Sequence, residues 1–528
     1  MKKLVWLLAA ALLCLASCAA AEISGDYAYA LLPEGGEAIT QYRGRDAVLE
    51  VPAVLDGQPV TVIDDGAFGG CYTLTSVTLP ATVKSIGREA FAGCIWLSRI
   101  DLPEGLAAIG GSAFASCESL TSVTLPASLT SLGEGAFQDC IRLTGVTVLG
   151  PLGAIQKETF SGCESLAAVS LPEGVAEIGE SAFSRCAGLT SVTLPEGVTE
   201  IGESAFYRCT GLTSVTLPDS LLSIGEDAFH YCASLAEISF PPRLAEIGNG
   251  AFSSCDSLTA AILPDSLTLL DDYAFANCDC LSAVRLPDGL TAIGLAAFLE
   301  CPALTAIELP DGLTTIGAYA FGNCTGLTDV VIPGSVETIR YDAFLGCESL
   351  ENVTLSEGVR SIGEDAFRAC GIRSITLPDS LAVMEDNPFT DCANLTAVRV
   401  SPDHPAFAVV NGALISRADM RLVCWPCGSE SAVCTVPPGI RIIGEWAFFH
   451  CAGLTAVELP NSVTAIEGYA FYDCPGLSSL NLPASVSEIG FSALPVDSLP
   501  PLALTVTPGS YAEQYCREHA WDYICAGD

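Results

Sequence analysis

Phenylalanine recurs along this 528-residue chain every 23 residues, and this spacing constrains the fold more than any other feature. The series runs from Phe68 to Phe367, takes one 22-residue step to Phe389, and resumes in register at Phe448 and Phe471. Seventeen phenylalanines fit the series. A fixed period of this length is typical of repeat architectures, in which each repeat forms one coil that buries its apolar side chains only against neighbouring coils.

The full repeat has the form C-x-x-L-x-x-V/I-x-L-P-x-x-L/V-x-x-I-G-x-x-A-F-x-x, as in residues 186–208. Its first half predicts a short strand, because apolar and polar residues alternate there. Val192 and Leu194 are expected to point inward, and Ser191 and Thr193 to point outward. Stacking neighbouring coils would then pair equivalent strands about 4.7–4.9 Å apart.

The second half of the repeat predicts turns and a second extended segment. Pro195 lacks an amide hydrogen and should end the strand, and residues 198–201 form the next extended piece. We expect Gly202 to permit a turn that other residues resist. Residues 204–206 are expected to form one helical or 3₁₀ turn that places Phe206 in the core.

This motif resembles the leucine-rich repeat of BspA-like, or treponemal-type, bacterial surface proteins. The resemblance covers about residues 45–495, and it extends to the segments 411–415 and 509–513. It implies a leucine-rich-repeat solenoid of the α/β horseshoe type, dominated by β-structure with short helical or 3₁₀ turns, in a right-handed stack with a cap at each end. It also implies a secreted or cell-surface protein without catalytic activity that serves adhesion or recognition, with no indication of the ligand.

Departures from the period predict the domain organisation. Residues 22–64 contain strand-like pieces but no repeat, and residues 399–436 interrupt the repeats as an inserted island. Near the carboxyl terminus, residues 508–519 predict a short helix that begins at Ser510. The expected domains are a signal segment, an amino-terminal cap, a solenoid, the island, resumed repeats and a carboxy-terminal cap, at 1–21, 22–64, 65–398, 399–436, 437–495 and 496–528.

The first segment has the order of a secretory signal, with two lysines, an apolar stretch and then small residues. Two interpretations of its processing remain open. Ala19-Ala20-Ala21 suits an ordinary signal peptidase, whereas Leu15-Ala16-Ser17-Cys18 resembles a bacterial lipobox in which Cys18 carries a lipid. Both interpretations predict export. In the second, the lipid on Cys18 would be the only attachment of the protein to a membrane.

The 25 cysteines divide between the repeat and a few other positions. Seventeen occupy the same repeat position, so we interpret them as mostly unoxidised core residues, although disulfides between neighbouring coils are an alternative. Cys424-Trp425-Pro426-Cys427 has the spacing of redox and metal sites, but a βαβ context and a fourth ligand are missing. A structural disulfide between Cys424 and Cys434 is expected instead, and Cys516 and Cys525 could likewise close the carboxy-terminal cap.

Charge excludes one class of partner. With 22 Lys and Arg against 62 Asp and Glu, the net charge of −40 argues against nucleic acid, which requires clustered basic residues. The acidic residues recur after the Leu-Pro and Ile-Gly pairs, which predicts two acidic stripes. We interpret these stripes as a device for solubility, with binding of a divalent cation as the alternative.

The outward strand face carries the first candidate binding site. It is monotonous in Ser and Thr until the carboxy-terminal half, where charged residues enter at Arg285, Glu308, Arg373, Arg399 and Glu458. The island carries the second candidate, with Phe407 and Trp425, because insertions in repeat arrays often carry binding.

No catalytic motif stands out from the repeat, and the four histidines show no metal-ligand spacing, so neither an enzyme, a metal nor a cofactor is predicted. The main hypothesis is therefore an exported protein that recognises an extracellular protein or glycan at a cell surface. A structural surface spacer or envelope component without a specific ligand is the alternative.

Overall fold

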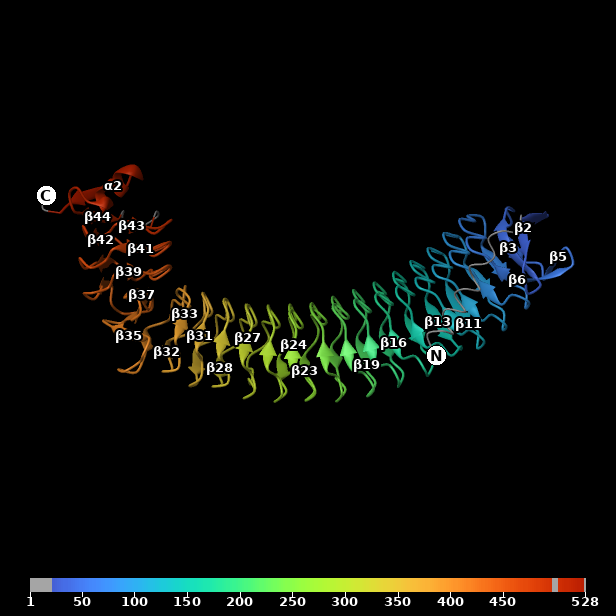
Figure 1. The fold of residues 1–528 in the computed structure, drawn as a ribbon, viewed down its shortest axis with the longest axis horizontal. Coiled ribbons are helices and arrows are strands. Elements are labelled where there is room, and N and C mark those ends of the chain that lie inside the picture. The colour runs from blue at the N-terminus through green and yellow to red at the C-terminus, as the bar shows by residue number, and fades with distance from the viewer. Residues whose placement is uncertain (1–20, 496–501, 527–528) are drawn as a thin grey trace. The chain divides into compact units, whose positions relative to one another are not determined.

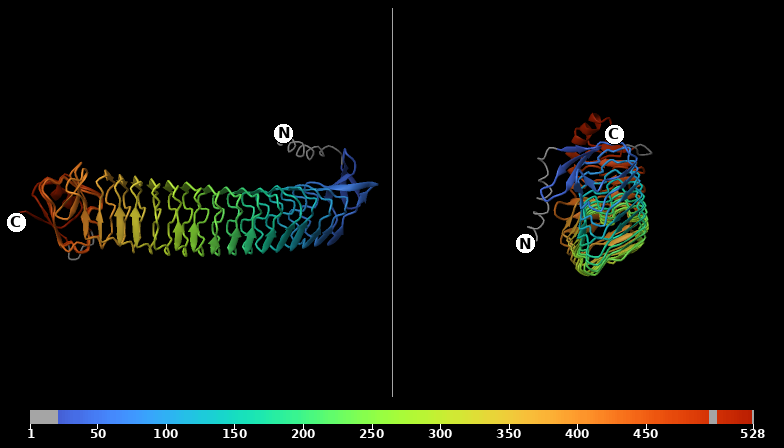
Figure 2. Two further views of the ribbon diagram at one scale, coloured as in Figure 1. Left: turned by 90° about the horizontal axis from the view of Figure 1, so that it is seen from below. Right: turned by 90° about the vertical axis from the view of Figure 1, so that its right-hand side faces the viewer.

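The computed structural model describes residues 21–495 and 502–526. Residues 1–20 of the predicted signal, including Cys18, lie outside the described residues, as do 496–501 and 527–528 of the predicted carboxy-terminal cap. The chain forms two compact units, residues 1–258 and 259–528. Within each unit, successive coils lie side by side with their strands aligned, which confirms the predicted repeat solenoid (Figures 1 and 2).

Each coil has three sides, which we call the front face, the back face and the turn side. In residues 186–208 the front face is the strand Ser191–Thr193, the back face is the strand Glu200–Ile201, and the turn side is 202–208. As predicted, Val192 and Leu194 are each 3% exposed, whereas the side chains of the alternate residues face outward.

In the first unit, parallel pairing keeps a register of 23 residues from coil to coil, as between Ser191 and Ser214. The front strands are β4 (Val48–Glu50), β7 (Ser76–Thr78), β9 (Arg99–Asp101), β11 (Ser122–Leu125), β13 (Gly145–Val148), β15 (Ala168–Ser170), β17 (Ser191–Thr193), β19 (Ser214–Thr216) and β21 (Glu237–Ile238). The back strands are β6 (Gln58–Ile63), β8 (Ser85–Ile86), β10 (Ala108–Ile109), β12 (Ser131–Leu132), β14 (Ala154–Ile155), β16 (Glu177–Ile178), β18 (Glu200–Ile201), β20 (Ser223–Ile224) and β22 (Glu246–Ile247).

The turn side contains a ladder of backbone hydrogen bonds of its own. The amides of Ser204, Phe206 and Arg208 each donate to a carbonyl of the following coil at 2.8 Å. Ser204 and Arg208 have left-handed backbone conformations, with φ of 55° and 58°. The predicted single helical turn is therefore a series of three hydrogen-bonded turns, which start at Gly202, Ser204 and Phe206, because a left-handed residue on each side of Phe206 interrupts a helix.

Gly202 is required for a different reason from the one predicted. Its φ lies outside the left-handed region, but a Cβ there would stand 2.8 Å from the amide nitrogen of Glu180 and 2.9 Å from the carbonyl carbon of Gly179. The glycine therefore permits close approach of two coils, since any side chain would collide with backbone.

The core of each coil contains the repeat phenylalanine and the repeat cysteine. In the first unit the rings stack in parallel, as in Phe206 and Phe229, whose centroids are 5.1 Å apart at 3°. The thiol of Cys209 is buried and donates to the carbonyl oxygen of Phe183 at 3.1 Å. Burial raises the pKa of the Cys209 thiol to about 12. The repeat cysteines of this kind are thus small core residues whose thiols bond to backbone, as predicted.

The amino-terminal cap of the first unit is a small antiparallel sheet. It consists of β1 (Glu22–Ser24), β2 (Tyr27–Leu31) and β3 (Glu37–Tyr42), with β3 paired in parallel to β6 and the short β5 (Val54–Leu55) beside it. Tyr42 stacks on Phe68 at 5.3 Å and so covers the first repeat ring. Glu37 is fully buried, and its burial together with the charges of Asp56 and Glu22 raises its pKa.

The second unit repeats the arrangement. Its front strands are β23 (Ala260–Ile262), β25 (Ala283–Arg285), β28 (Asp329–Ile332), β30 (Asn352–Leu355), β32 (Ser374–Thr376), β34 (Ala397–Arg399), β38 (Val433–Thr435), β40 (Ala456–Glu458), β42 (Ser479–Leu482), β44 (Ala503–Val506) and β45 (Tyr523–Cys525). Its back strands are β24 (Leu269–Leu270), β26 (Ala292–Ile293), β27 (Thr315–Ile316), β29 (Thr338–Ile339), β31 (Ser361–Ile362), β33 (Val383–Met384), β39 (Ile442–Ile443), β41 (Ala465–Ile466) and β43 (Glu488–Ile489).

The island forms a meander that rejoins the back face. Strands β35 (Phe407–Val410), β36 (Ala413–Ser416) and β37 (Arg421–Cys424) pair antiparallel, and β37 then pairs in parallel with β39. Helix α2 (Tyr511–Glu518) follows in the carboxy-terminal cap. Its amino-terminal cap is Ser510, whose hydroxyl accepts from the amide of Glu513, so the predicted helix and its start are confirmed.

Candidate functional site

The predicted front-face residues of the second unit all lie at the surface, but they do not form one cluster. Arg285, Glu308, Arg399 and Glu458 occupy the same position in four different coils, whereas Arg373 precedes the front strand of another coil. Four of the five make a local contact. Arg285 pairs with Asp265 at 3.1 Å, Arg373 with Glu351 at 3.0 Å, Arg399 donates to Ser374 at 2.9 Å, and Glu458 accepts from Thr435 at 3.0 Å.

The front face of the first unit is more uniform. One column of hydroxyls lies just before the front strands and donates to the carbonyl of the equivalent residue one coil earlier, as Thr213 does to Thr190 at 2.9 Å and Thr144 to Thr121 at 3.0 Å. These hydroxyls are therefore occupied in joining coils. This arrangement gives the Thr-rich sequence a structural explanation.

The front strands form several short sheets in each unit, and one of the breaks between them lies beside Glu308. Between β25 and β28 the described chain forms only an isolated bridge, from Ala306 to Asp329. A depression of about 470 Å³ opens there, and its lining includes Ile307, Glu308, Asp329 and Val331. Val331 is 59% exposed. The depression therefore combines an apolar wall with three carboxylates, those of Glu308, Asp311 and Asp329.

The carboxylate of Asp329 is held in place within this depression. Its two oxygens accept from Thr328 at 2.7 Å and from Asn352 at 2.6 Å. These hydrogen bonds lower the pKa of Asp329, because they favour the charged form. Asp329 thus carries a fixed negative charge at neutral pH.

Both predicted binding residues of the island are in the core, which corrects the prediction that they contact a ligand. Phe407 is 4% exposed and Trp425 is 5% exposed. Trp425 lies 23 residues before Phe448, and the two rings stack at 6.2 Å. The tryptophan therefore occupies the position of a repeat phenylalanine, and the 23-residue spacing itself would have revealed this.

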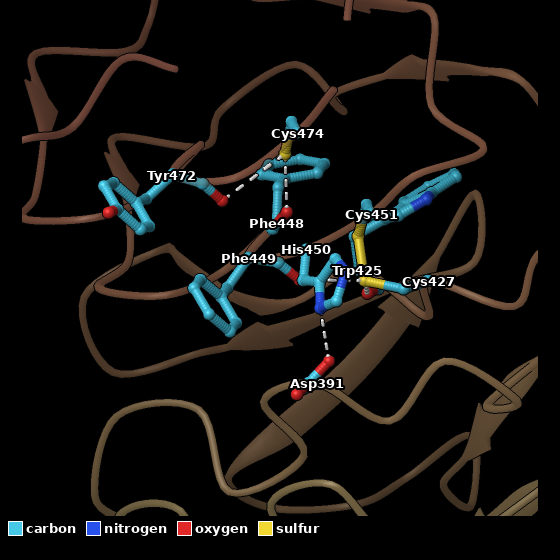
Figure 3. Close-up of polar contacts among 9 residues, drawn as sticks. All are labelled: Asp391, Trp425, Cys427, Phe448, Phe449, His450, Cys451, Tyr472 and Cys474. Carbon is cyan, nitrogen blue, oxygen red and sulfur yellow. Dashed lines mark hydrogen bonds and ion pairs between the residues drawn. A yellow bond between two sulfur atoms is a disulfide. The ribbon is translucent and has the colours of Figure 1, made fainter. Parts of the chain in front are cut away.

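The predicted disulfides are also wrong. Cys427 is bonded to Cys451, while the thiols of Cys424, Cys434, Cys516 and Cys525 are free (Figure 3). Cys424 and Cys434 are buried on different sides of the coil, since Cys434 pairs in register with Val457 on the front face whereas Cys424 ends a back strand. Cys516 is fully buried in the apolar core of the cap, so it packs as a hydrophobic residue.

A cavity of about 400 Å³ lies where the island meets β33. Its lining includes Met384, Phe407 and Arg421. The guanidinium of Arg421 is paired with Asp419 at 2.9 Å and also with Glu467. The positive charge of Arg421 in this cavity is thus already neutralised by ion pairs within the chain.

Sequence reasoning missed a group of aromatic side chains on the turn side of the second unit. We call Trp446, Phe449, Tyr469, Tyr472 and Phe491 the aromatic strip. Trp446 and Phe449 lie two residues before and one residue after Phe448, and the two tyrosines hold the same positions in the next coil. The signal was available in the 23-residue spacing of positions that flank the repeat phenylalanine. Figure 3 shows Phe449 and Tyr472 projecting to the same side, away from the buried Phe448 and Trp425.

Within residues 21–495 and 502–526, no group of three or more His, Cys, Asp or Glu side chains is arranged to hold a metal ion. In the same part of the chain, no helix has the length and apolar character needed to cross a membrane. The acidic stripes are therefore not drawn together into a coordination site in the described structure.

The stacked coils, the Leu-Pro and Ile-Gly positions and the exposed faces define a leucine-rich-repeat solenoid. The model of the BspA type leucine rich repeat region matches residues 57–167, 153–282, 270–396 and 427–506. The chain belongs to this family of BspA-type leucine-rich-repeat proteins, as the repeat motif predicted. Proteins of the family are typically bacterial surface proteins and generally act as binding scaffolds without enzymatic activity.

Solved structures of bacterial leucine-rich-repeat proteins are similar to this chain. A leucine-rich repeat protein from Bacteroides ovatus is 23% identical, with 96% of this chain and 99% of that chain covered and a TM-score of 0.47. A leucine rich cell surface protein from Faecalibacterium prausnitzii is 27% identical over 73% of this chain and 96% of that one, with a TM-score of 0.38. The leucine rich repeat protein of T. pallidum is 31% identical over 45% of this chain and 91% of that chain, with a TM-score of 0.27. No curated protein matches the chain.

Proposed function

We propose that this protein is an exported recognition protein without catalytic activity, which binds an extracellular protein at a cell surface through the front face of its second unit. The observation that carries this proposal is the depression beside Glu308. Its lining combines the exposed side chain of Val331 with the carboxylates of Glu308, Asp311 and Asp329, at a point where only an isolated bridge joins the neighbouring coils.

The surface around the depression has the composition of a protein interface. An apolar centre with a polar or charged rim is typical of such surfaces. Ile262, which holds the position equivalent to Arg285, Glu308 and Val331, is 62% exposed. Side chains of three chemical kinds therefore follow one another along a single column, which gives this face the variety that specific recognition needs.

A structural role is favoured for the first unit. The hydroxyl column that joins coils runs through both units, as in Thr213 with Thr190 and Thr396 with Arg373, but only in the first unit do hydroxyls such as Thr193 and Thr216 also fill most outward strand positions. This surface varies little from coil to coil. We assign the first unit the role of a spacer and the second unit the role of recognition.

The test is a binding screen of the exported chain against matrix proteins, mucins and a glycan array, with and without chelator and at two salt concentrations. Saturable binding to a protein is expected. The double variant Glu308→Ala, Val331→Ala should weaken it roughly tenfold, as loss of central interface residues does. Thr193→Ala with Thr216→Ala, at the same position in the first unit, is the matched control and should bind like wild type.

Other outcomes would count against the proposal. Binding confined to glycans would replace the protein partner with a carbohydrate. A screen with no saturable binding would favour a spacer role for the whole chain. Equal loss in the two double variants would show that the depression has no special part in recognition.

A further inference from the structure

The aromatic strip of the second unit is a compact array of rings at the surface. Trp446 and Tyr469 are parallel, with centroids 4.1 Å apart at 1°, and Phe449 and Tyr472 are parallel at 6.1 Å and 4°. Edge contacts join the two pairs, at 5.1 Å between Trp446 and Phe449 and at 5.6 Å between the tyrosines. Phe491 extends the array with an edge contact to Tyr469 at 5.6 Å.

Part of this apolar surface is open to solvent. Phe491 is 75% exposed and Tyr472 is 37% exposed, while the other three rings are half-buried. Contiguous exposed aromatic side chains are uncommon on a protein without a partner, and Trp and Tyr are enriched among the residues that dominate binding energies. The strip therefore has the composition of a docking surface, and it is separate from the front face.

Arginine side chains of this protein already lie over aromatic rings on the turn side. Arg368 lies over the ring of Phe449 at 5.8 Å. In the first unit, Arg208 lies over Tyr207 at 5.3 Å and over Tyr231 at 5.2 Å, and Tyr207 holds the same position beside the repeat phenylalanine as Phe449. Ring faces at these positions can therefore receive a guanidinium group. Among the described residues, no arginine or lysine lies over Tyr472 or Phe491.

The charges beside the strip also favour a cation. Asp473 follows Tyr472 and is exposed, and Glu445 precedes Trp446 and is half-buried. Burial and the charges of Asp386 and Glu467 raise the pKa of Glu445, so a cation bound nearby would relieve repulsion. A guanidinium suits this surface better than an ammonium, because it is planar, weakly hydrated and able to stack on a ring while bonding to a carboxylate.

We propose that the aromatic strip is a second binding surface, which docks an arginine-bearing segment of a partner protein. An arginine of the partner stacks on the exposed rings of Tyr472 and Phe491, and Asp473 supplies the opposite charge. Arg368 on Phe449 shows the same contact within the chain itself. The strip binds independently of the depression at Glu308, so the proposal for one surface can be wrong while the proposal for the other holds.

The test measures binding of a fluorescein-labelled arginine–glycine repeat peptide by fluorescence anisotropy, with a lysine–glycine peptide of the same length for comparison. Tyr472→Ala with Phe491→Ala leaves the net charge unchanged, so it separates stacking from the general attraction of a chain with charge −40. We expect the arginine peptide to bind roughly tenfold more weakly to this variant, which corresponds to about 1.4 kcal/mol. Tyr472→Phe should retain binding.

The matched control removes two exposed aromatic side chains elsewhere. Tyr72→Ala with Trp96→Ala lies in the first unit, where these residues are 64% and 59% exposed, and should bind the peptide like wild type. Unchanged thermal unfolding of both double variants will show that they fold. The proposal is overturned if the strip variant binds the arginine peptide as wild type does, if the control loses as much, or if both peptides bind equally tightly. A glycan that requires the strip, with no arginine-peptide binding, would also overturn it.

Discussion

The indole ring of Trp425 stacks on the phenyl ring of Phe448 with centroids 6.2 Å apart. The tryptophan thereby begins the second run of core rings after the island, and Phe448 stacks in turn on Phe471 at 4.9 Å. Repeats resume in register after the island because the island already supplies a turn side around Trp425 and the front strand β38.

Replacement of Trp425 should destabilise the second unit. Trp425→Ala removes a large buried side chain and leaves a cavity, so we expect a loss of about 3–5 kcal/mol in the free energy of unfolding. Trp425→Phe restores the ring of the repeat and should cost less than about 1.5 kcal/mol. Urea unfolding of the whole chain measures both. Trp96→Ala is the control, because that side chain is 59% exposed. Equal losses at Trp96 and Trp425 would contradict a core role for the island residue.

Close approach at Gly202 gives a second prediction. Gly202→Ala places a methyl group against the backbone of residues 179 and 180, so the coils must separate, and we expect a loss of about 1–3 kcal/mol. Ser204→Gly should instead be neutral or stabilising by up to about 1 kcal/mol, because residue 204 has a left-handed backbone. Denaturant unfolding monitored by circular dichroism distinguishes these results, and the opposite order would refute the assignment.

Thiol chemistry should separate the cysteines by position. Cys280 is exposed and should react with iodoacetamide in the native protein. Cys209 should react only after denaturation, because burial raises its pKa to about 12 and hides the sulfur. Peptide mapping without reduction should recover a peptide pair linked through Cys427 and Cys451. Recovery of a link between Cys424 and Cys434 would contradict this disulfide.

The buried carboxyl of Glu37 should make the stability of the first unit depend on pH. Its pKa is raised in the folded protein, so the folded state binds the proton more tightly than the unfolded chain does. The stabilising contribution is complete below the unfolded pKa of about 4.3 and is lost as the pH rises through the folded pKa. Glu37→Gln should therefore be more stable than wild type at neutral pH, and the difference should shrink as the pH falls toward the unfolded pKa.

Unfolding of wild type and variant at several pH values measures this difference. Glu50→Gln is the control, since Glu50 is an exposed residue of the neighbouring strand β4. A pH-independent difference between wild type and Glu37→Gln would show that the raised pKa has no effect on stability.

Most of the fold could be predicted because each position of the repeat occurs many times in the same structural environment. The alternation at Val192 and Leu194, the strand end at Pro195 and the helix start at Ser510 each rest on local chemistry, and the structure confirms them. The identity of the bonded cysteines could not be predicted in this way, because pairing depends on which side of a coil each residue occupies. Cys427 meets Cys451 because the two residues are 24 positions apart, about one coil, so they lie next to each other where the turn side ends.

The candidate sites were less accessible to sequence reasoning. Arg285 and Arg373 were correctly placed at the surface, but their ion pairs with Asp265 and Glu351 depend on contacts between coils. The 23-residue spacing of Trp425 before Phe448 indicates a core position, whereas Phe407 lies in an island without the repeat, so only the structure shows that its side chain is buried. An isolated aromatic residue looks the same in sequence whether it covers a core or faces a partner.

The constant register of the coils also affects how such a chain can change in length. Ser191 pairs with Ser214 on the front face and Glu200 pairs with Ser223 on the back face, so one coil is interchangeable with the next along the backbone. Removal or duplication of 23 residues within the first unit would therefore leave every hydrogen-bond ladder and ring stack in phase. Unequal recombination between the repeated gene segments would yield shorter or longer proteins that keep the same two ends, so reach can evolve separately from recognition.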